Sequence, residues 1–331
     1  MQRQLGTNGP MVSALGMGTW GIGGPSSAGS QPLGWGGQYD REAAGHVLAA
    51  AFDAGITLFD TADAYGCGTA ERLIGENLAQ HRDEITLVSK WGNVINEATR
   101  QLEGTNSTPA YDHNALDASL RRLRTDHLDL YLLHLSGLPA AEANDLVGTL
   151  VDLVDAGKIG GYGWSTDDPA LAAAWIGQPG FSAIEFEINV VRDAPELVEL
   201  CEHRDLAALA RGPLGTGLLT GKYSGDRRIE DPEDFRYASP EWLNYFQNGQ
   251  PVERYASRLA VLTEILTANG RTLAQGALAW LWARSPNLIP IPGARTVEQV
   301  RENAAAMHHG PLAASEMTAI HDTLASLVEP R

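Results

Sequence analysis

A regular alternation between short apolar stretches and longer helical patterns is the feature that most constrains how this chain folds. Eight stretches have the length and apolar composition of buried strands: Leu15 to Gly18, Thr57 to Asp60, Ile85 to Ser89, Leu128 to His134, Ile159 to Trp164, Ala183 to Phe186, Leu206 to Ala210 and Leu288 to Ile291. The helix-length crossovers between them predict parallel pairing. Eight such units in 331 residues favour one α/β domain over residues 1–331, closed as a (β/α)8 TIM barrel. A doubly wound open sheet is the second interpretation.

The segments between these strands have the pattern of amphipathic helices. Apolar side chains recur at i, i+4 and i+7 in two of them, at Leu116, Leu120 and Leu123 and at Tyr255, Leu259 and Leu262. Helix starts are marked by a capping residue before a proline in Asp168-Pro169, and by two capping-box pairs, Thr272 with Gln275 and Thr296 with Gln299.

Other segments depart from this alternation. Residues 1–13 predict a β-hairpin that caps the fold, with strands Arg3 to Leu5 and Met11 to Ser13 around the turn Thr7-Asn8-Gly9. The Gly/Pro/Ser-rich residues 21–39 and residues 211–250 predict long loops at the C-terminal face, which are either functional or mobile decoration. Residues 314–331 predict a C-terminal helix and tail.

Charge and cysteine content restrict the classes of partner. The net charge is −17, and the chain has no run of Lys or Arg, so neither nucleic acid nor an anionic membrane surface is expected to bind. Cys67 and Cys201 are too few for a disulfide framework, and the N-terminus lacks the pattern of a secretion signal. We therefore expect a cytoplasmic protein.

One motif suggests a Rossmann dinucleotide site but lacks its context. Residues 16–21 satisfy GxGxxG and follow a strand. The Rossmann motif needs a helix to begin within it, because the N-terminal amides of that helix meet the pyrophosphate. Here Gly23-Gly24-Pro25 follows, where no helix can begin. We interpret these glycines as residues that let the chain turn at the mouth of the barrel.

Four reactive side chains fall at or just after the ends of consecutive predicted strands. Asp60 ends the second strand, Tyr65 follows five residues later, Lys90 ends the third and His134 ends the fourth. Each alone has an ordinary explanation, as a helix cap, a packed aromatic, a rim charge or a core histidine. Together they occupy the C-terminal rim, where the active sites of parallel barrels lie.

These residue types fit the reduction of a carbonyl group. Addition of a hydride to the carbonyl carbon leaves negative charge on oxygen, so a proton donor must stand beside that oxygen. Tyr65 is the candidate donor, and we expect the Lys90 ammonium to lower its pKa. Asp60 would hold Lys90 in an ion pair, and His134 would orient the carbonyl. The chemistry requires no metal, but it does require a hydride-carrying cofactor.

These motifs resemble the aldo-keto reductase superfamily. The resemblance rests on residues 55–66 (GITLFDTADAYG), Ser89-Lys90 and residues 129–134 (DLYLLH), and extends from residues 15–20 to residues 291–295 and Glu302-Asn303. It implies a (β/α)8 barrel that binds NADP(H), with NAD(H) less expected, in an extended form without a Rossmann fold. It also implies a catalytic tetrad of Asp60, Tyr65, Lys90 and His134.

The resemblance further implies where the cofactor contacts lie. The nicotinamide end would be lined by Gly18, Thr19, Trp20, Asp60, Ser165, Thr166, Glu185 and Arg211. The pyrophosphate would be held by Gly212, Pro213, Leu214, Gly217 and Lys222. The adenosine 2′-phosphate would be surrounded by Gly293, Ala294, Arg295, Gln299, Glu302 and Asn303.

The chain departs from the common family pattern at the nicotinamide end. Arg211 stands where many members have an aromatic residue, Glu185 replaces a glutamine and Thr166 replaces an asparagine. We hypothesise that Glu185 pairs with Arg211, because both stand at neighbouring strand ends. Gly293 and Ala294 replace a lysine and a serine found in some branches, which weakens the prediction of NADP over NAD.

Two classes of function remain open from the sequence. The first is an enzyme that reduces aldehydes or ketones, or runs the reverse reaction, on a small-molecule substrate whose identity and direction the sequence leaves open. The alternative is a nicotinamide-binding redox-sensing or regulatory subunit with little turnover, since channel-associated members of the superfamily keep the barrel, the cofactor and the tetrad. Steady turnover of added carbonyls separates the two.

Overall fold

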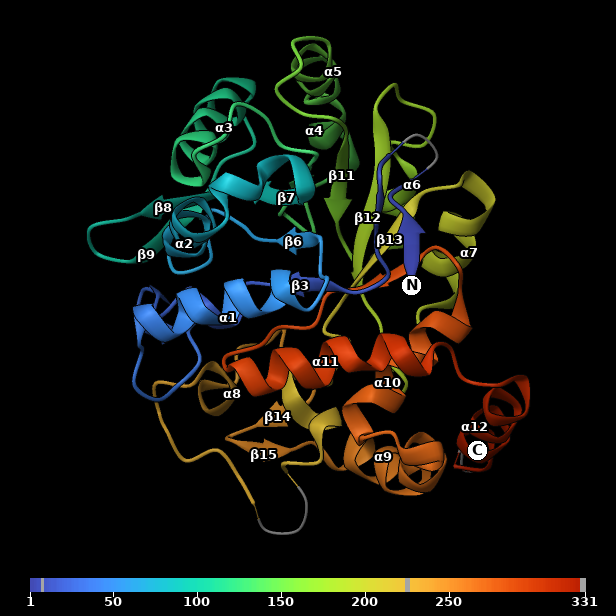
Figure 1. Cartoon of the computed structure of the whole chain (residues 1–331). Coiled ribbons are helices and arrows are strands. Elements are labelled where there is room, and N and C mark those ends of the chain that lie inside the picture. Colours follow the sequence, from blue (N-terminus) through green and yellow to red (C-terminus); the bar gives the residue numbers. More distant parts are fainter. Residues whose placement is uncertain (7–8, 224–226, 328–331) are drawn as a thin grey trace.

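Eight parallel strands form the centre of the molecule (Figure 1), a computed structural model that describes residues 1–6, 9–223 and 227–327. In sequence order they are β3 (Gly16–Gly18), β6 (Leu58–Asp60), β7 (Thr86–Trp91), β10 (Leu130–Leu133), β11 (Tyr162–Ser165), β12 (Phe181–Glu187), β13 (Ala207–Arg211) and β16 (Leu288–Pro290). The sheet runs in the order β16-β13-β12-β11-β10-β7-β6-β3. Gly18 closes it through a parallel bridge to Gly293. The predicted barrel and all eight strands are confirmed, and the open sheet is wrong.

Helices surround these strands on the outside (Figure 1). Those that follow the strands are α1 (Arg41–Asp53), α2 (Thr69–Asn77), α3 (Pro109–Leu123), α4 (Ala140–Asn144), α5 (Val147–Asp155), α6 (Pro169–Ala173), α7 (Pro195–Arg204), α10 (Leu273–Arg284) and α11 (Val297–His309). Two more, α9 (Glu253–Leu266) and α12 (Ala314–Ser326), pack against each other. Short 3-10 turns are η1 (Trp20–Ile22), η2 (Ala79–Glu84), η3 (Gly215–Thr220) and η4 (Ala268–Gly270).

All three predicted helix starts are confirmed, and one of the two predicted capping boxes forms completely. Asp168 caps α6 by accepting hydrogen bonds from the amides of Ala170 and Leu171, and Thr272 forms a full capping box with Gln275 at α10. At α11, Thr296 accepts from the Gln299 amide, but the Gln299 side chain accepts from the amide of Arg295 at 2.8 Å. That amide lies one residue before the cap, so the reciprocal half of the second predicted capping box does not form.

The barrel interior is filled by side chains two residues apart along the strands. Its apolar cluster includes Leu58, Val88, Leu130, Leu132, Ala183, Leu209 and Ile289. Period-two alternation sends these side chains inward, while neighbours such as Leu87 and Tyr131 pack against the helices.

A hairpin closes the N-terminal end of this interior. Strand β1 (Gln2–Gln4) pairs antiparallel with β2 (Met11–Ser13), and Leu5 and Val12 belong to the same apolar cluster as the barrel interior. The first strand begins and ends one residue earlier than the sequence predicts. Thr7 and Asn8 of the predicted turn lie outside the described residues.

Short strands that the sequence did not indicate lie in the predicted long loops and in residues 93–105. β4 (Ser27–Ala28), β5 (Gln31–Pro32), β8 (Asn93–Asn96) and β9 (Gln101–Thr105) form a four-stranded sheet outside the barrel, and β14 (Phe246–Gln247) pairs with β15 (Gln250–Pro251). β4, β5, β14 and β15 have two residues each, too few for a readable periodicity, which is why the sequence missed them. The amides of Gly36 and Gly37 donate to Asp234 and Asp231, which ties residues 21–39 to the segment that holds α8 (Phe235–Ala238).

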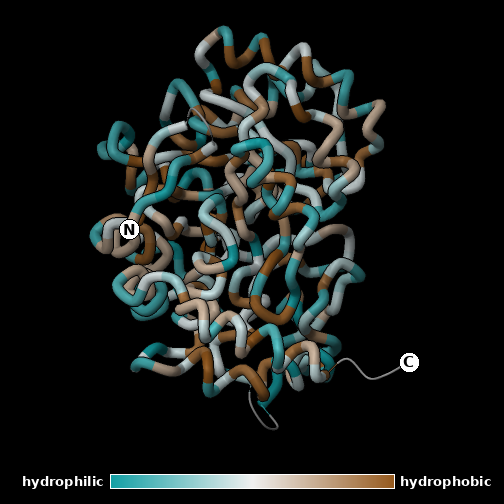
Figure 2. Tube along the Cα trace, turned by 90° about the vertical axis from the view of Figure 1, so that its right-hand side faces the viewer, coloured by the Kyte–Doolittle hydropathy of each residue, from teal (hydrophilic) through white to brown (hydrophobic). Residues whose placement is uncertain are grey.

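Figure 2 shows that hydrophobic and hydrophilic residues alternate at short intervals along the chain. Within the described part of the chain, no helix combines the length and the apolar character needed to cross a bilayer.

Candidate active site

The structure brings the four predicted tetrad residues together at the C-terminal ends of the strands. Lys90 Nζ lies 2.6 Å from Asp60 Oδ1 and 3.1 Å from Tyr65 Oη. The ring of Tyr65 meets that of His134 edge to face, with 5.9 Å between the ring centroids. Lys90 is completely buried, and its ammonium also donates to the carbonyl of Thr61 at 3.0 Å.

Strand alternation explains why these side chains point into the barrel. Leu58 and Val88 belong to the apolar interior, so Asp60 and Lys90, two residues further along the same strands, face inward one level nearer the mouth. Ser89, which lies between Val88 and Lys90 on β7, faces outward, and its hydroxyl donates to Glu71 Oε1 at 2.6 Å.

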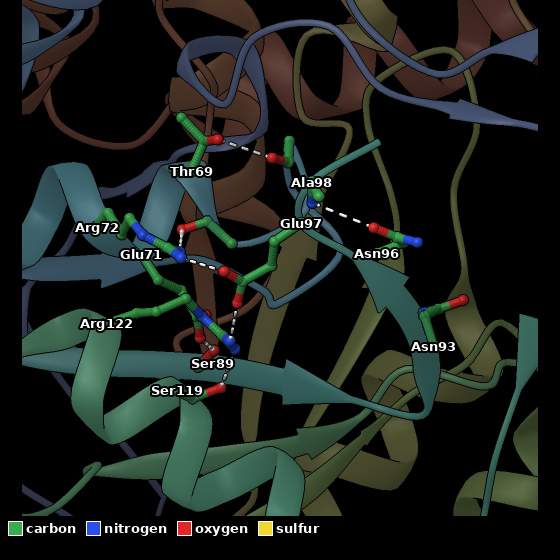
Figure 3. A network of polar contacts seen from close by, with 12 residues as sticks. Thr69, Glu71, Arg72, Ser89, Asn93, Asn96, Glu97, Ala98, Ser119 and Arg122 are labelled. Atoms are coloured by element: carbon green, nitrogen blue, oxygen red, sulfur yellow. Dashed lines mark hydrogen bonds and ion pairs between the residues drawn. The ribbon is translucent and has the colours of Figure 1, made fainter. Parts of the chain in front are cut away.

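An ion-pair network fixes the outer side of this region (Figure 3). Arg122 on α3 donates to Glu71 on α2 at 2.6 Å and to Glu97 at 2.9 Å, and Glu97 also pairs with Arg72. Glu71 is fully buried and also accepts from Ser89, so the network ties α2 and α3 to the strand that carries Lys90.

The charges around Lys90 keep it protonated. Burial disfavours the charged form, but the carboxylates of Asp60 and Glu185 outweigh this effect and raise the pKa of Lys90 above its ordinary value. Glu185 Oε2 lies 3.3 Å from Lys90 Nζ, which makes it a second acidic neighbour of the ammonium.

The expectation that Lys90 lowers the pKa of Tyr65 is wrong for the net direction. Burial raises the pKa of Tyr65, and the charges of Asp60 and Glu185 add to this effect, while Lys90 offsets only part of it. Tyr65 is therefore a neutral phenol that carries its proton.

His134 is neutral as well. Burial, together with the positive charges of Lys90 and Arg211, lowers the pKa of His134 to about 3. Its Nδ1 lies 3.5 Å from the side-chain nitrogen of Asn93. Because an amide nitrogen only donates, this contact favours the tautomer in which Nε2 carries the hydrogen.

The hypothesis that Glu185 pairs with Arg211 is wrong. Arg211 forms its ion pair with Asp167, whereas Glu185 accepts from Ser165 at 3.0 Å and faces Lys90. The strand register is the physical reason, because Arg211 stands opposite Glu187 and Glu185 lies two residues deeper, opposite Leu209.

The remaining residues predicted for the nicotinamide end divide into two groups. Ser165 points into the site beside Glu185, and Trp20 lies against Tyr65 with 6.3 Å between ring centroids. The hydroxyls of Thr19 and Thr166 instead donate to the backbone carbonyls of Asp60 and Ser136, so both hold neighbouring strand ends in place. Gly18 has no room for a side chain, because a Cβ there would lie 2.8 Å from the Ile291 carbonyl oxygen.

The residues predicted for the pyrophosphate lie in a tight, glycine-rich turn after β13. Gly212 and Gly217 have φ of +59° and +103°, a region that favours glycine. Pro213 is buried, Leu214 is half-buried and Lys222 is exposed.

The residues predicted for the 2′-phosphate surround the start of α11. Gly293 is exposed and Ala294 is buried, while Arg295 is half-buried near Arg236. Along the helix, Asn303 is buried, and the carbonyl of Glu302 accepts from the Gln275 side chain.

Sequence reasoning missed Asp167 and Phe235 at the mouth of the site. Asp167, the partner of Arg211, follows the end of β11 by two residues, a position where a strand-end search would have found it. Phe235 and Trp242 pack against Trp20, with centroid distances of 4.5 and 5.9 Å. No local pattern indicated Phe235, because its segment lies far from Trp20 in the sequence, whereas Trp242 is one of the aromatic candidates for the pocket that the sequence offers.

The aromatic side chains that the sequence offers as candidates for the substrate pocket, among them Trp91, Trp164, Trp242 and Tyr245, divide by burial. Trp91, Trp164 and Tyr245 are fully buried in the core outside the barrel interior. Trp242, in contrast, is 52% exposed.

A closed eight-stranded barrel with Asp, Tyr, Lys and His converging at its strand ends defines a class of protein. Residues 14–325 match the profile of the aldo/keto reductase family, and the chain belongs to this family of enzymes. The aldo-keto reductase yakc (NADP(+)) of Schizosaccharomyces pombe is 33% identical over 318 residues, which covers 92% of this chain and 86% of the relative.

Solved structures agree with this membership. A glycerol dehydrogenase from Gluconobacter oxydans is 26% identical, with a TM-score of 0.81 and coverage of 100% of this chain and 97% of that one. An aldo-keto reductase from Klebsiella pneumoniae, solved in complex with NADPH, is 26% identical, with a TM-score of 0.68 and coverage of 97% and 95%.

Proposed function

We propose that this protein transfers a hydride between NADP(H) and a small aldehyde or ketone, or the corresponding alcohol, with Tyr65 as the proton donor. The observation that carries the proposal is the position of Lys90 Nζ, between Asp60 Oδ1 at 2.6 Å and Tyr65 Oη at 3.1 Å. The net charge of −17 disfavours nucleic acid and anionic membranes as partners, so a small-molecule substrate is favoured. The two cysteines are typical of a protein in a reducing compartment such as the cytoplasm.

The residues around the site fit a nicotinamide dinucleotide phosphate. Ser165 and Glu185 are both buried and lie side by side in the site, so polar groups are available for the nicotinamide amide. Arg295 precedes the N-terminus of the 13-residue helix α11, where positive charge and free amides favour phosphate. The cofactor would supply the hydride. Relatives named for NADP(+) or solved with NADPH support this choice.

The side chains of the protein would handle the proton. As negative charge develops on the carbonyl oxygen, Tyr65 donates its hydroxyl proton to that oxygen. The Lys90 ammonium stabilises the resulting phenolate, and Asp60 holds Lys90 in place and charged. Neutral His134 donates a hydrogen bond from Nε2 that orients the carbonyl.

Replacement of Tyr65 by Phe tests the assignment, because it removes one hydroxyl and preserves the ring. We expect turnover of aldehydes by NADPH to fall by a factor on the order of 10²–10⁴, the usual contribution of a general acid. NADPH affinity, followed by fluorescence titration, should change little. If Tyr65→Phe turned over aldehydes as fast as wild type, this result would contradict the role of Tyr65 as proton donor. Tight NADPH binding without turnover on any carbonyl would instead favour the redox-sensing subunit.

A further inference from the structure

Two carboxyl groups face the single ammonium of Lys90 in the interior of the barrel. Asp60 Oδ1 lies 2.6 Å and Glu185 Oε2 lies 3.3 Å from Lys90 Nζ. The side chains of Lys90, Asp60 and Glu185 are 0%, 3% and 1% exposed. If all three were ionised, this water-poor site would carry one uncompensated negative charge.

Other charged groups near Glu185 do not remove this excess. Arg211 on β13 is engaged by Asp167, and Glu187 on β12 pairs with Arg192 at 3.0 Å. From the remaining elements, Ser165 on β11 faces Glu185 as a neutral hydroxyl, and Tyr65 and His134 are neutral.

One of the two carboxyl oxygens of Glu185 makes no hydrogen bond to the described residues, and a proton bound there would let it make one. Glu185 Oε1 accepts from Ser165, but Oε2 has only its ion-pair contact with Lys90 and makes no hydrogen bond in the part of the chain that the structure describes. Burial and the neighbouring charge of Glu185 raise the pKa of Asp60 well above its usual range. Two carboxylates that share one site resist double ionisation, which raises the pKa of one of them.

We propose that Asp60 and Glu185 share one proton at neutral pH and that this proton replenishes Tyr65 through Lys90. The second part rests on the proposed function. After Tyr65 has given its proton to the carbonyl oxygen, Lys90 Nζ–H passes a proton to the phenolate oxygen. The carboxyl pair then returns a proton to the neutral amine. The pair ends doubly ionised beside a charged Lys90, and solvent restores its proton when the product leaves. Glu185 is thus a positioning residue that acts through Lys90.

Infrared spectroscopy of the protein without substrate tests the shared proton directly. The carbonyl stretch of a protonated carboxyl group lies at higher frequency than the bands of carboxylates and amides. We expect a wild-type band at neutral pH that is absent from both Glu185→Gln and Asp60→Asn. Glu187→Gln is the matched control, because Glu187 lies two residues away on the same strand and has its own cation; it should keep the band.

The infrared measurement uses no substrate, so its outcome does not depend on whether the protein turns over a carbonyl. Asp63 and Asp112 are also buried acids with raised pKa values, but they are common to all variants and cancel in difference spectra. A difference spectrum for Glu185→Gln that shows only the loss of a carboxylate would overturn the proposal. A band that persists in Asp60→Asn would show a proton held by Glu185 alone and would overturn sharing. If Asp60→Asn does not fold, Asp60→Glu replaces it, because this variant keeps a carboxyl group: a band that shifts in both Asp60→Glu and Glu185→Asp supports sharing, and a band unchanged in Asp60→Glu overturns it.

The role in catalysis has its own readout. We expect kcat of Glu185→Gln to fall more steeply than that of wild type as pH rises, because reprotonation of Tyr65 then depends on solvent, and Glu185→Asp should recover part of the loss. A purely structural role would lower kcat by the same factor at every pH, and that result would overturn the proton store. Absence of turnover in wild type as well would count against the proposed function, while the infrared result would stand.

Discussion

Two levels of the same barrel interior differ sharply in chemistry although the same strands build both. At the lower level the strands contribute Leu58, Val88 and Ala183, which pack in one apolar cluster. Two residues further along the same strands stand Asp60, Lys90 and Glu185, all buried and all ionisable. The sequence step between the levels is identical in the three strands, yet the side chains change from apolar to charged.

The difference shows how the barrel separates stability from chemistry. The lower level removes apolar surface from water, which stabilises the fold by roughly 25 cal/mol per Å². The upper level removes charges from water, which costs free energy unless the charges are paired. The packed lower level therefore holds strands in register, and that register keeps the upper charges within hydrogen-bond distance.

Removal of the cation at the upper level should have the largest effect on stability. Lys90→Met leaves the carboxyl groups of Asp60 and Glu185 buried without their ammonium. We expect the free energy of unfolding to fall by about 3–5 kcal/mol, measured by urea denaturation, together with loss of turnover. The double variant Lys90→Met/Glu185→Gln should recover part of the stability but no activity. If Lys90→Met were as stable as wild type, the burial of these charges would carry no free-energy penalty that the ion pairs offset.

A cavity at the lower level should destabilise the protein without the same loss of chemistry. Leu130→Ala empties part of the interior cluster, and we expect the free energy of unfolding to fall by about 2–5 kcal/mol. Turnover per folded molecule, measured well below the unfolding temperature, should stay close to wild type. A loss of turnover as large as that of Tyr65→Phe would break the separation between the two levels.

At the rim, the protonation of His134 should make the free energy of unfolding depend on pH. The folded protein keeps His134 neutral down to a pKa of about 3, whereas the unfolded chain protonates it near its ordinary value of 6.5. The unfolded state thus binds more protons between these values, so the contribution of His134 is complete above about pH 6.5 and is lost as pH falls towards 3. Melting temperatures of His134→Asn should fall less than those of wild type over this window; parallel curves would contradict the assignment.

The exposed ion pair at the mouth should contribute least. The side chains of Arg211 and Asp167 are 35% and 36% exposed, so water already screens their attraction. We expect Asp167→Asn to change the free energy of unfolding by less than about 1 kcal/mol in urea denaturation. A loss comparable to that of Lys90→Met would show that depth in the barrel does not govern the energy of these pairs.

The sequence by itself determined the barrel and the meeting of the four reactive residues. Strand length, helix periodicity and capping signals are local properties, and parallel strands align their C-terminal ends whatever the loops do. Asp60, Lys90 and His134 could therefore be assigned to one rim from their places at strand ends. Tyr65 followed because only a short turn separates it from Asp60.

Only the tertiary structure decided which charges pair and how strongly burial acts on them. Glu185 and Arg211 stand at neighbouring strand ends, but the register between β12 and β13 directs Glu185 to Lys90 and places Arg211 beside Asp167. The pKa of Tyr65 rises because burial outweighs the ammonium of Lys90, and burial is the sum of contacts from segments distant in sequence. Depth and register arise only when the strands close into a barrel, which is why residue spacing predicted the composition of the site but not its electrostatics.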